Sequence, residues 1–411
     1  MLCKGKMQTM STIKIADRMS RIQQSASSVA TQRARLLRAE GHDVVTLSVG
    51  EPDFPTPEHI IDAAAAGAKR GETRYTHAAG TPALKQAIVD KFKRENGLEY
   101  TLDEVMVSSG GKQVIFDAII STIEKDDEVI VPAPYWISYI DHVKFAGGTP
   151  VVVECSEQND FKLMPDQLEA AITSKTRWLI INSPSNPSGA VYSEADLKAL
   201  GEVLLRHPNV AILCDDIYEH ILYDGHKFAT LAAAEPRLFD RTVTMNGVSK
   251  AYSMTGWRIG YCGGPVYLLK EMTKLQQQVT GSNSAVSQAA ALAALTGPQD
   301  FVAERTQKFQ DRRDLVVSMI NQAKGLSCDT PKGAFYVFPN CAELMGKKTP
   351  DGKVIENDTD LVMYFLEIEH VAVVQGAAYG LSPFFRISFA TSDEELIKGC
   401  KRIQRACAAL V

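Results

Sequence analysis

The sequence has no long apolar segment. Its longest stretch without a charged residue, Leu275 to Gln299, is rich in Gln, Ser, Thr, Asn and Gly and would not partition into a bilayer. The first residues, MLCKGKMQTMSTIK, hold no apolar core of the kind that a secretory signal requires. We therefore expect no membrane partner and no secretory signal.

Cysteine and histidine are few and scattered. The eight cysteines form no Cys-x-x-Cys pair, and the eight histidines show no metal-binding spacing such as H-x-x-x-H. These patterns argue against a disulfide framework and against a metal hydrolase. Reduced thiols predict a cytoplasmic protein, and no metal site is expected.

The chain also lacks a basic excess. Its formal net charge is −5, so nucleic acid is not an expected partner. Hydrophobic residues make up 45% of the chain and charged residues 23%, which excludes a disordered or fibrous chain. The 411 residues suffice for two substantial cores.

The middle of the chain alternates short apolar runs with helical patterns such as 112–123, 194–206 and 266–279. Runs of Val, Ile and Leu that alternate with helices predict a mostly parallel sheet covered on both faces. The predicted strands are 105–107, 128–131, 151–153, 178–181, 210–213, 243–245 and 259–262.

The pattern changes after about Gly297. A long helix is predicted over 301–323, and a last helix follows Ser392. Between them we expect strands at 334–338, 371–374 and 385–389 and a helix at 358–369. This part of the chain predicts a second, smaller α/β domain, with which a helix at 27–40 is expected to pack.

Four motifs directly follow predicted strands, where open parallel sheets bind ligands. Ser108-Ser109-Gly110-Gly111-Lys112 offers glycines and a helix N-terminus to an anion, although alone it is more typical of an ordinary turn. Asn182-Ser183-Pro184-Ser185-Asn186-Pro187-Ser188-Gly189 is a stiff loop that could direct the Asn186 amide at a ligand, and its composition equally suits a plain turn.

The other two motifs carry charged groups. Asp215-Asp216-Ile217-Tyr218 puts a carboxylate at the end of an apolar strand, where it needs a cation unless it only caps a helix. In Ser249-Lys250-Ala251-Tyr252-Ser253-Met254-Thr255-Gly256-Trp257-Arg258, Lys250 lies among small and apolar residues, which lower the pKa of a lysine, and Arg258 could hold a phosphate. A solvated lysine is the alternative.

Together the four motifs supply a lysine for an imine, a carboxylate for a ring nitrogen, donors for a phenolic oxygen and a phosphate site. Pyridoxal 5'-phosphate requires this combination.

From about Arg18 to Leu410 the sequence resembles the class I aminotransferases of pyridoxal-phosphate fold type I, especially the bacterial aspartate/prephenate branch. The motifs that carry the resemblance are Gly50-Glu51-Pro52-Asp53-Phe54, Tyr75 with Ala79-Gly80, Gly110-Gly111-Lys112-Gln113, Pro134-Tyr135-Trp136, Asn186-Pro187-Ser188-Gly189, Asp215-Asp216-Ile217-Tyr218, Ser249-Lys250-Ala251, Gly256-Trp257-Arg258 and Phe385-Arg386-Ile387-Ser388.

The resemblance implies a role for each site residue. Lys250 would hold the cofactor covalently and move a proton, and Asp215 would keep the ring nitrogen protonated. Tyr218 and Asn186 would bind the ring oxygen, and Trp136 would stack beside the ring. The resemblance further implies a phosphate site formed by Gly110, Gly111, Lys112, Ser249 and Arg258, and a substrate site formed by Gly50, Trp136, Asn186 and Arg386.

The same resemblance also implies a contact between subunits. Tyr75 would reach a phosphate in the other subunit, which implies a homodimer with shared sites. We expect the distal carboxylate of an acidic substrate to bind Lys112, with help from Ser25 or Ser27. No second arginine is evident for that group, because the segment Thr280-Gly281-Ser282-Asn283-Ser284 is uncharged.

The chain departs from relatives at three places. Gly247 stands where some have a phosphate-binding serine, and Asn-Pro-Ser-Gly replaces Asn-Pro-Thr-Gly. Relatives often have Lys-Pro-Ser-x-Thr where this chain has Gln23-Gln24-Ser25-Ala26-Ser27. A lysine there is associated with prephenate use, so its absence counts against that substrate.

The resulting prediction is a cytoplasmic aminotransferase that exchanges an amino group between an amino acid, with aspartate favoured, and 2-oxoglutarate. The alternatives are prephenate, aromatic or broad neutral specificity, a lyase or synthase on the same fold, and a regulator fused to a DNA-binding domain, for which the segment before Arg18 is short. We expect an N-terminal extension at 1–17, a segment packing with the small domain at 18–58, a large cofactor-binding domain at 59–300 and a small domain at 301–411.

Overall fold

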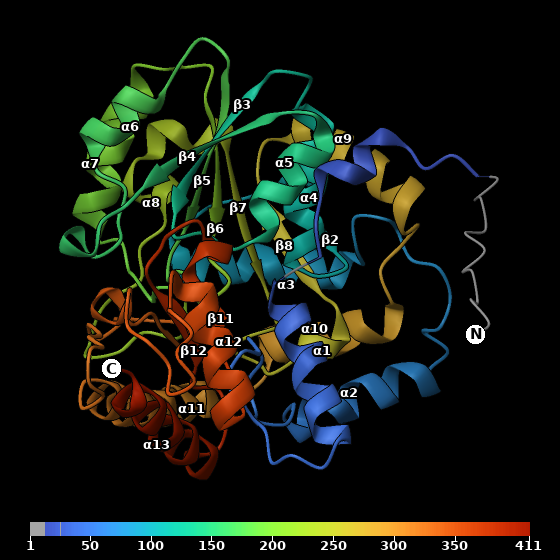
Figure 1. Ribbon diagram of the computed structural model, residues 1–411. Coiled ribbons are helices and arrows are strands. Elements are labelled where there is room, and N and C mark those ends of the chain that lie inside the picture. Colours follow the sequence, from blue (N-terminus) through green and yellow to red (C-terminus); the bar gives the residue numbers. More distant parts are fainter. Residues whose placement is uncertain (1–12, 25) are drawn as a thin grey trace.

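A seven-stranded sheet forms the centre of the larger half of the molecule (Figure 1). The computed structural model describes residues 13–24 and 26–411, without the side chains of residues 26–31. The strand order is β2-β8-β7-β6-β5-β3-β4, in which β8 is antiparallel to both neighbours and the other pairs are parallel. All seven predicted strands are present: β2 (Val105–Ser108), β3 (Glu128–Ala133), β4 (Thr149–Glu154), β5 (Thr176–Asn182), β6 (Ala211–Asp215), β7 (Thr242–Gly247) and β8 (Gly260–Gly263).

Helices cover both faces of this sheet (Figure 1). Trp178 and Ile180 of β5 pack on one side, and Leu179 and Ile181 pack on the other. Because side chains alternate along a strand, a continuous apolar run buries both faces. One face carries α4 (Gly111–Thr122), α5 (Ser138–Ala146) and α9 (Val266–Val279), and the other carries α6 (Pro165–Ala171), α7 (Glu194–Leu205) and α8 (Leu231–Ala234).

A separate cluster of helices packs beside β2. Its apolar core joins Val105 and Val107 to residues such as Ile60, Leu84 and Ala291. The helices are α2 (Glu58–Lys69), α3 (Pro82–Lys91) and α10 (Ala285–Thr296).

The C-terminal residues form a second core around a three-stranded antiparallel sheet of order β11-β12-β9. The elements are α11 (Asp300–Ile320), β9 (Tyr336–Val337), α12 (Asp358–Glu369), β10 (Val371–Ala372), β11 (Val374–Gln375), β12 (Phe385–Ser388) and α13 (Asp393–Ala409). The predicted strand 371–374 is in fact two strands, since β10 pairs with β1 (Val45–Thr46) and β11 pairs with β12.

The N-terminal helix α1 (Ala26–Ala39) lies beside α12 and the C-terminal strands (Figure 1). Its Ala34 and Leu37 pack against Val44, Leu366 and Ala372. The predicted fold class, a large mostly parallel α/β unit with a smaller α/β unit, is confirmed, while the exact domain boundaries remain a prediction. No helix among the described residues is both long and apolar enough to cross a membrane.

A buried ion pair fixes the loop that follows β6. Lys91, at the end of α3, is fully buried and contacts Glu219, which is 5% exposed. Asn96 bonds both groups: its Oδ1 accepts from Lys91 Nζ at 2.7 Å, and its Nδ2 donates to Glu219 Oε2 at 2.6 Å. Burial opposes ionisation of Glu219, but Lys91 and His220 outweigh it and lower the pKa of the carboxyl.

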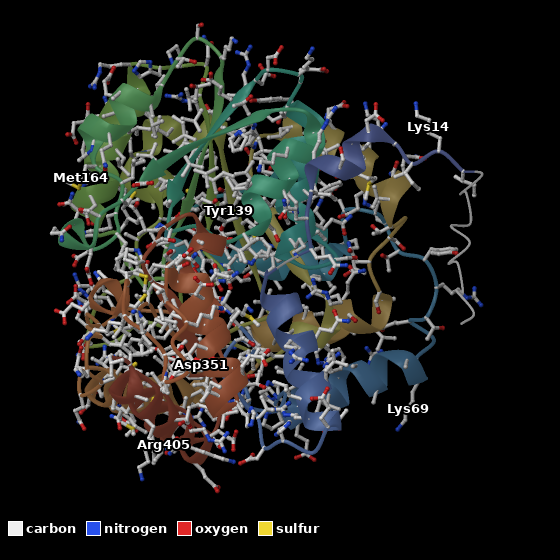
Figure 2. The ribbon with its side chains drawn as sticks, in the orientation of Figure 1. Lys14, Lys69, Tyr139, Met164, Asp351 and Arg405 are labelled. Carbon is white, nitrogen blue, oxygen red and sulfur yellow. The ribbon has the colours of Figure 1, made fainter. Side chains whose placement is uncertain are left out.

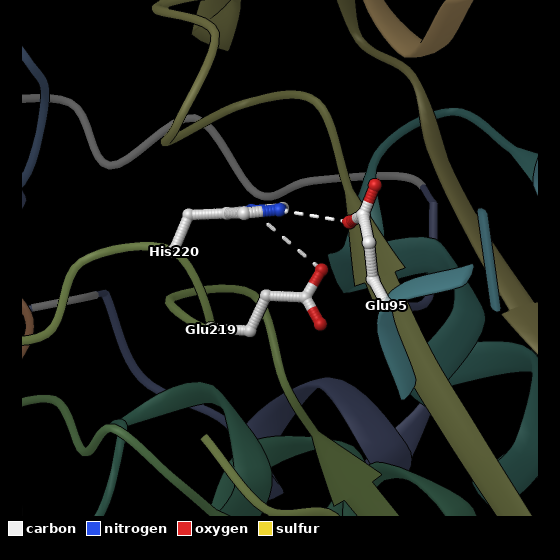
Figure 3. Close-up of side chains that lie close together, drawn as sticks. All are labelled: Glu95, Glu219 and His220. Carbon is white, nitrogen blue, oxygen red and sulfur yellow. Dashed lines mark hydrogen bonds and ion pairs between the residues drawn. The ribbon is translucent and has the colours of Figure 1, made fainter. Parts of the chain in front are cut away.

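Figure 3 shows the neighbouring His220 beside Glu219 and Glu95. The His220 Nε2 lies 2.9 Å from Glu95 Oε2, and its Nδ1 lies 3.6 Å from Glu219 Oε1. Ligand atoms of the three residues lie within 4.8 Å of one another. The Lys91 ammonium already supplies a positive charge to this group, so we assign the cluster a structural role.

Replacing Lys91 by Met should destabilise the protein by about 3–5 kcal/mol, because Glu219 would be left buried without its cation. Urea unfolding followed by fluorescence measures the change. Lys93→Met is the matched control: the Lys93–Glu99 pair is exposed, so its loss should cost less than about 1 kcal/mol. Equal stability of the two variants would show that the buried pair is not stabilising.

Candidate active site

The carboxyl ends of three adjacent strands meet at one edge of the large sheet. Asn182 ends β5 and pairs in register with Asp215, which ends β6 and pairs with Met245 of β7. Ser249 and Lys250 follow β7 directly. The strand register therefore brings three of the predicted motifs together.

A cavity of about 780 Å³ opens at this edge. The predicted site residues that line it are Gly50, Gly111, Lys112, Trp136, Asn186, Asp215, Tyr218, Ser249, Lys250, Arg258 and Arg386. They come from both cores, since Arg386 lies on β12 and Gly50 follows β1.

Among the predicted site residues whose side chains the structure describes, Gly110 and Tyr75 are not in the lining. Gly110 lies just behind it, against the Arg258 guanidinium. Tyr75 is 98% exposed and borders another cavity, between the α2 and α10 region and its own loop. Ser25 lies outside the described residues, and the side chain of Ser27 is likewise not described.

Asp215 is a buried carboxylate with its own hydrogen bonds. Its Oδ2 accepts from the Tyr139 hydroxyl at 2.6 Å, and its Oδ1 accepts from the Ile217 backbone N–H at 3.3 Å. Burial raises the pKa of Asp215 to about 6, although both bonds and the charge of Lys250 act in the opposite direction. Figure 2 shows Tyr139 in the interior, in contrast with Lys69 and Arg405 at the periphery. The site thus holds a desolvated carboxylate that would be stabilised by a cationic partner.

Lys250 has the properties of a reactive amine. Its Nζ donates to the Gly50 carbonyl at 2.6 Å and lies 5.6 Å from the centre of the Tyr218 ring. Burial, followed by the charge of Arg386, lowers its pKa to about 8. A larger fraction of the amine is therefore unprotonated near neutral pH than for a solvated lysine, as imine formation requires.

The start of α4 forms an anion cradle with Arg258. Gly110 has a φ of +90°, and a methyl group on it would collide with the Arg258 guanidinium. A methyl group on Gly260 would collide with the backbone of Gly110 and Gly111. Arg258 Nη1 donates to the Thr255 carbonyl at 2.8 Å, which fixes the guanidinium beside the helix N-terminus. Free N–H groups and an arginine at one point suit a phosphate.

Arg386 is a buried guanidinium whose donors are only partly used. Its Nη1 donates to Asn186 Oδ1 at 2.9 Å and its Nη2 to the Ser48 carbonyl at 2.5 Å. The Nε has no hydrogen-bond partner among the described residues. A buried arginine that lines a cavity and has an unused donor is suited to a carboxylate.

Two aromatic contacts complete the lining. The Tyr218 and Tyr336 hydroxyls lie 2.7 Å apart, and burial together with Tyr336 raises the pKa of Tyr218 well above its usual value. Lys112 Nζ lies 4.9 Å from the centre of the Trp136 ring. Partial burial, and then Arg258, lower the pKa of Lys112.

Sequence reasoning missed several residues of this site, among them two tyrosines and two residues of α1. Tyr139 bonds Asp215, Tyr336 bonds Tyr218, and Gln32 and Arg35 of α1 line the cavity. Tyr139 lies one helical turn after Trp136, which was the only local signal for it. Tertiary contacts bring Tyr336 and the α1 residues to the site, and no local sequence pattern predicts those contacts.

Comparisons with known proteins agree with this geometry. Residues 42–403 match the family model "Aminotransferase class I and II". An aspartate aminotransferase of Rhizobium meliloti is 57% identical and covers 92% of both chains, and an aspartate/prephenate aminotransferase of Cereibacter sphaeroides is 53% identical over 96% of this chain and 99% of its own. The crystal structure of an aspartate aminotransferase from Rhizobium meliloti superposes with a TM-score of 0.95 at 55% identity, covering 97% of this chain and 100% of that one. With this match along nearly its whole length, the chain belongs to the class I and II aminotransferases.

Proposed function

We propose that this aminotransferase uses pyridoxal 5'-phosphate to exchange the amino group of aspartate with 2-oxoglutarate. The observation that carries the proposal is the convergence of Lys250, Asp215 and Arg386 on one cavity. These are an amine of lowered pKa, a buried carboxylate and a buried arginine with a spare donor. The names of the relatives support aspartate as the donor.

The cavity residues fit the cofactor group by group. Arg258, Ser249 and the start of α4 at Gly110, Gly111 and Lys112 would hold its phosphate. Asp215 would hold a proton on the ring nitrogen, because a buried carboxylate gains most from a cation. When bound, the cofactor supplies an electron sink for negative charge at the substrate Cα.

The protein's own groups would then carry out the proton chemistry. Lys250 would hold the cofactor and afterwards move a proton at the substrate Cα, for which a pKa near 8 is well matched to neutral conditions. Tyr218 and Asn186 would donate to the ring oxygen. Their positions are fixed by Tyr336 and Arg386, which bond them in the protein.

The substrate would be held at both ends. Arg386 would bind the α-carboxylate, near Gly50 and Trp136. Lys112 would bind the distal carboxylate, since its ammonium makes no ion pair with any described residue and lies at the cavity wall. The hydroxyl of Ser25 or Ser27 would assist there.

Prephenate is the second candidate substrate. The name of the Cereibacter sphaeroides relative favours it. Gln23, which lies in the segment where relatives often carry a lysine, is exposed and does not line the cavity, and this favours aspartate.

We also propose a homodimer with shared sites and a cytoplasmic location. Tyr75 is almost fully exposed and borders the cavity that Ala63 of α2 and several residues of α10 also line. This exposure suits a residue that contacts a second subunit. All seven cysteines in the described part of the chain are free and buried, which suits a reducing compartment.

Lys250→Ala should abolish covalent attachment of the cofactor, because no other lysine of lowered pKa is placed against Tyr218 in the described residues. Borohydride reduction of the loaded wild type, followed by peptide mass mapping, should label Lys250. A label on Lys112 or on another lysine would contradict the assignment.

Asp215→Asn should retain the cofactor but lose about a thousandfold or more in turnover, because a neutral amide cannot hold the ring proton. Steady-state kinetics measures the loss. Asp216→Asn is the control: Asp216 is also buried, burial raises its pKa well above the usual value, and it does not line the cavity. Comparable rates in the two variants would show that Asp215 only caps the loop.

Lys112→Ala should lower the kcat/KM ratio of aspartate to alanine by about a factor of 30 or more, because only aspartate brings a distal charge. The half-reaction with each amino acid, followed by cofactor absorbance, gives the ratio. Lys144→Ala removes an exposed lysine outside the cavity and should leave the ratio unchanged. If both amino acids lose rate together, Lys112 supports the phosphate and does not select the substrate.

A further inference from the structure

The helix α1 is anchored on one side to the C-terminal core. Ala34 and Leu37, three residues apart, are buried against Leu366 and Ala372. Arg33 forms an ion pair with Glu367 at 3.1 Å. The buried contacts of Ala34 and Leu37 fix which face of α1 is left for the cavity, whereas the Arg33–Glu367 pair is solvent-accessible and adds little.

A different ridge of the same helix borders the cavity. Gln32 and Arg35 are three residues apart, so they lie on one face of the helix, and both line the cavity. Arg38, which is three residues further on, bonds the Val44 carbonyl at 2.7 Å and Thr46 Oγ1 at 2.9 Å. Arg35 is exposed and makes no hydrogen bond or ion pair with the residues that the structure describes.

The charged residues of the cavity indicate which ligand group Arg35 could bind. Among the described residues that line the cavity, the basic ones outnumber the acidic ones, which are Glu51 and Asp215. Glu51 accepts a hydrogen bond from Thr255. The proposed function assigns Arg258 to the phosphate, Arg386 to the α-carboxylate and Lys250 to the cofactor. It also assigns Lys112 to the distal carboxylate, so among the described basic residues of the cavity Arg35 is the one without an assigned role.

We propose that Arg35 is a second specificity-determining residue, which binds the distal carboxylate of dicarboxylic substrates together with Lys112. This inference rests on the proposed function. A guanidinium can bind a carboxylate with two parallel N–H groups, whereas the Lys112 ammonium acts as a point charge. Arg35 lies on the anchored helix α1, which fixes its place at the cavity. It therefore orients the distal carboxylate of the substrate as well as attracting its charge.

Binding of succinate to the holoenzyme tests the proposal without turnover, since succinate has two carboxylates and no amino group. Calorimetry should show that Arg35→Leu weakens succinate binding about fivefold, as expected for a solvent-accessible ion pair. Arg33→Leu is the matched control, because it removes the same charge two residues away and outside the cavity. It should change the dissociation constant less than twofold.

Three further measurements make the result decisive. The difference between the Arg35 and Arg33 variants should shrink between 50 and 500 mM salt, because an accessible pair is screened. Arg35→Lys should recover only part of the affinity. In the half-reaction, Arg35→Leu should raise KM for glutamate more than it lowers kcat, and should lower the kcat/KM ratio of glutamate to alanine.

Equal succinate affinities of the two leucine variants would overturn the proposal. If the wild type converts no amino acid while Arg35→Leu still weakens succinate binding selectively, the proposed function fails and the dicarboxylate site stands. If the wild type converts amino acids and the glutamate to alanine ratio is the same in both variants, the role of Arg35 fails and the proposed function stands.

Discussion

The burial of a carboxylate at the end of β6 is the constraint on which the site depends. Removing Asp215 from water is costly unless donors and cations replace the lost hydration. The protein supplies Tyr139 from α5, a backbone N–H from the following loop, and Lys250 from the segment after the neighbouring strand β7. The same loop is held at its other end by Glu219 and Lys91. Rigid anchoring at both ends keeps the carboxylate aimed at the cavity.

The site also requires that segments far apart in the sequence together form the walls of the cavity. Arg386 and Tyr336 come from the small sheet, and Gly50 comes from the segment after β1. The Gly50 carbonyl accepts from Lys250, and Tyr336 bonds Tyr218. The two cores therefore share hydrogen bonds through the reacting groups, and neither core alone forms the site.

Much of the fold and of the site could be predicted from the sequence. Strands such as β5 are buried on both faces, so their apolar runs are continuous and easy to recognise. The motifs at Asn186, Asp215 and Lys250 stand directly after such strands, and the strand register brings them together. Tyr139 and Tyr336 could not be predicted, because the residues that they bond lie far away in the chain. Arg35 could not be predicted, because only the packing of α1 on the C-terminal core places it at the cavity. On the sequence, Arg35 is one of several arginines in an ordinary helical pattern.

The pairing of β1 with β10 has a consequence for synthesis on the ribosome. Val371 follows its partner Val45 by 326 residues. At roughly 5–20 residues per second, the ribosome needs about 16–65 s to deliver the second strand after the first has been made. During that time β1 has no partner strand, while the strands of the large sheet are synthesised and can already pair. The last part of the chain to leave the ribosome thus completes the cavity, and a truncated product would keep the sheet and Lys250 but lack Arg386, to which we assign the substrate α-carboxylate.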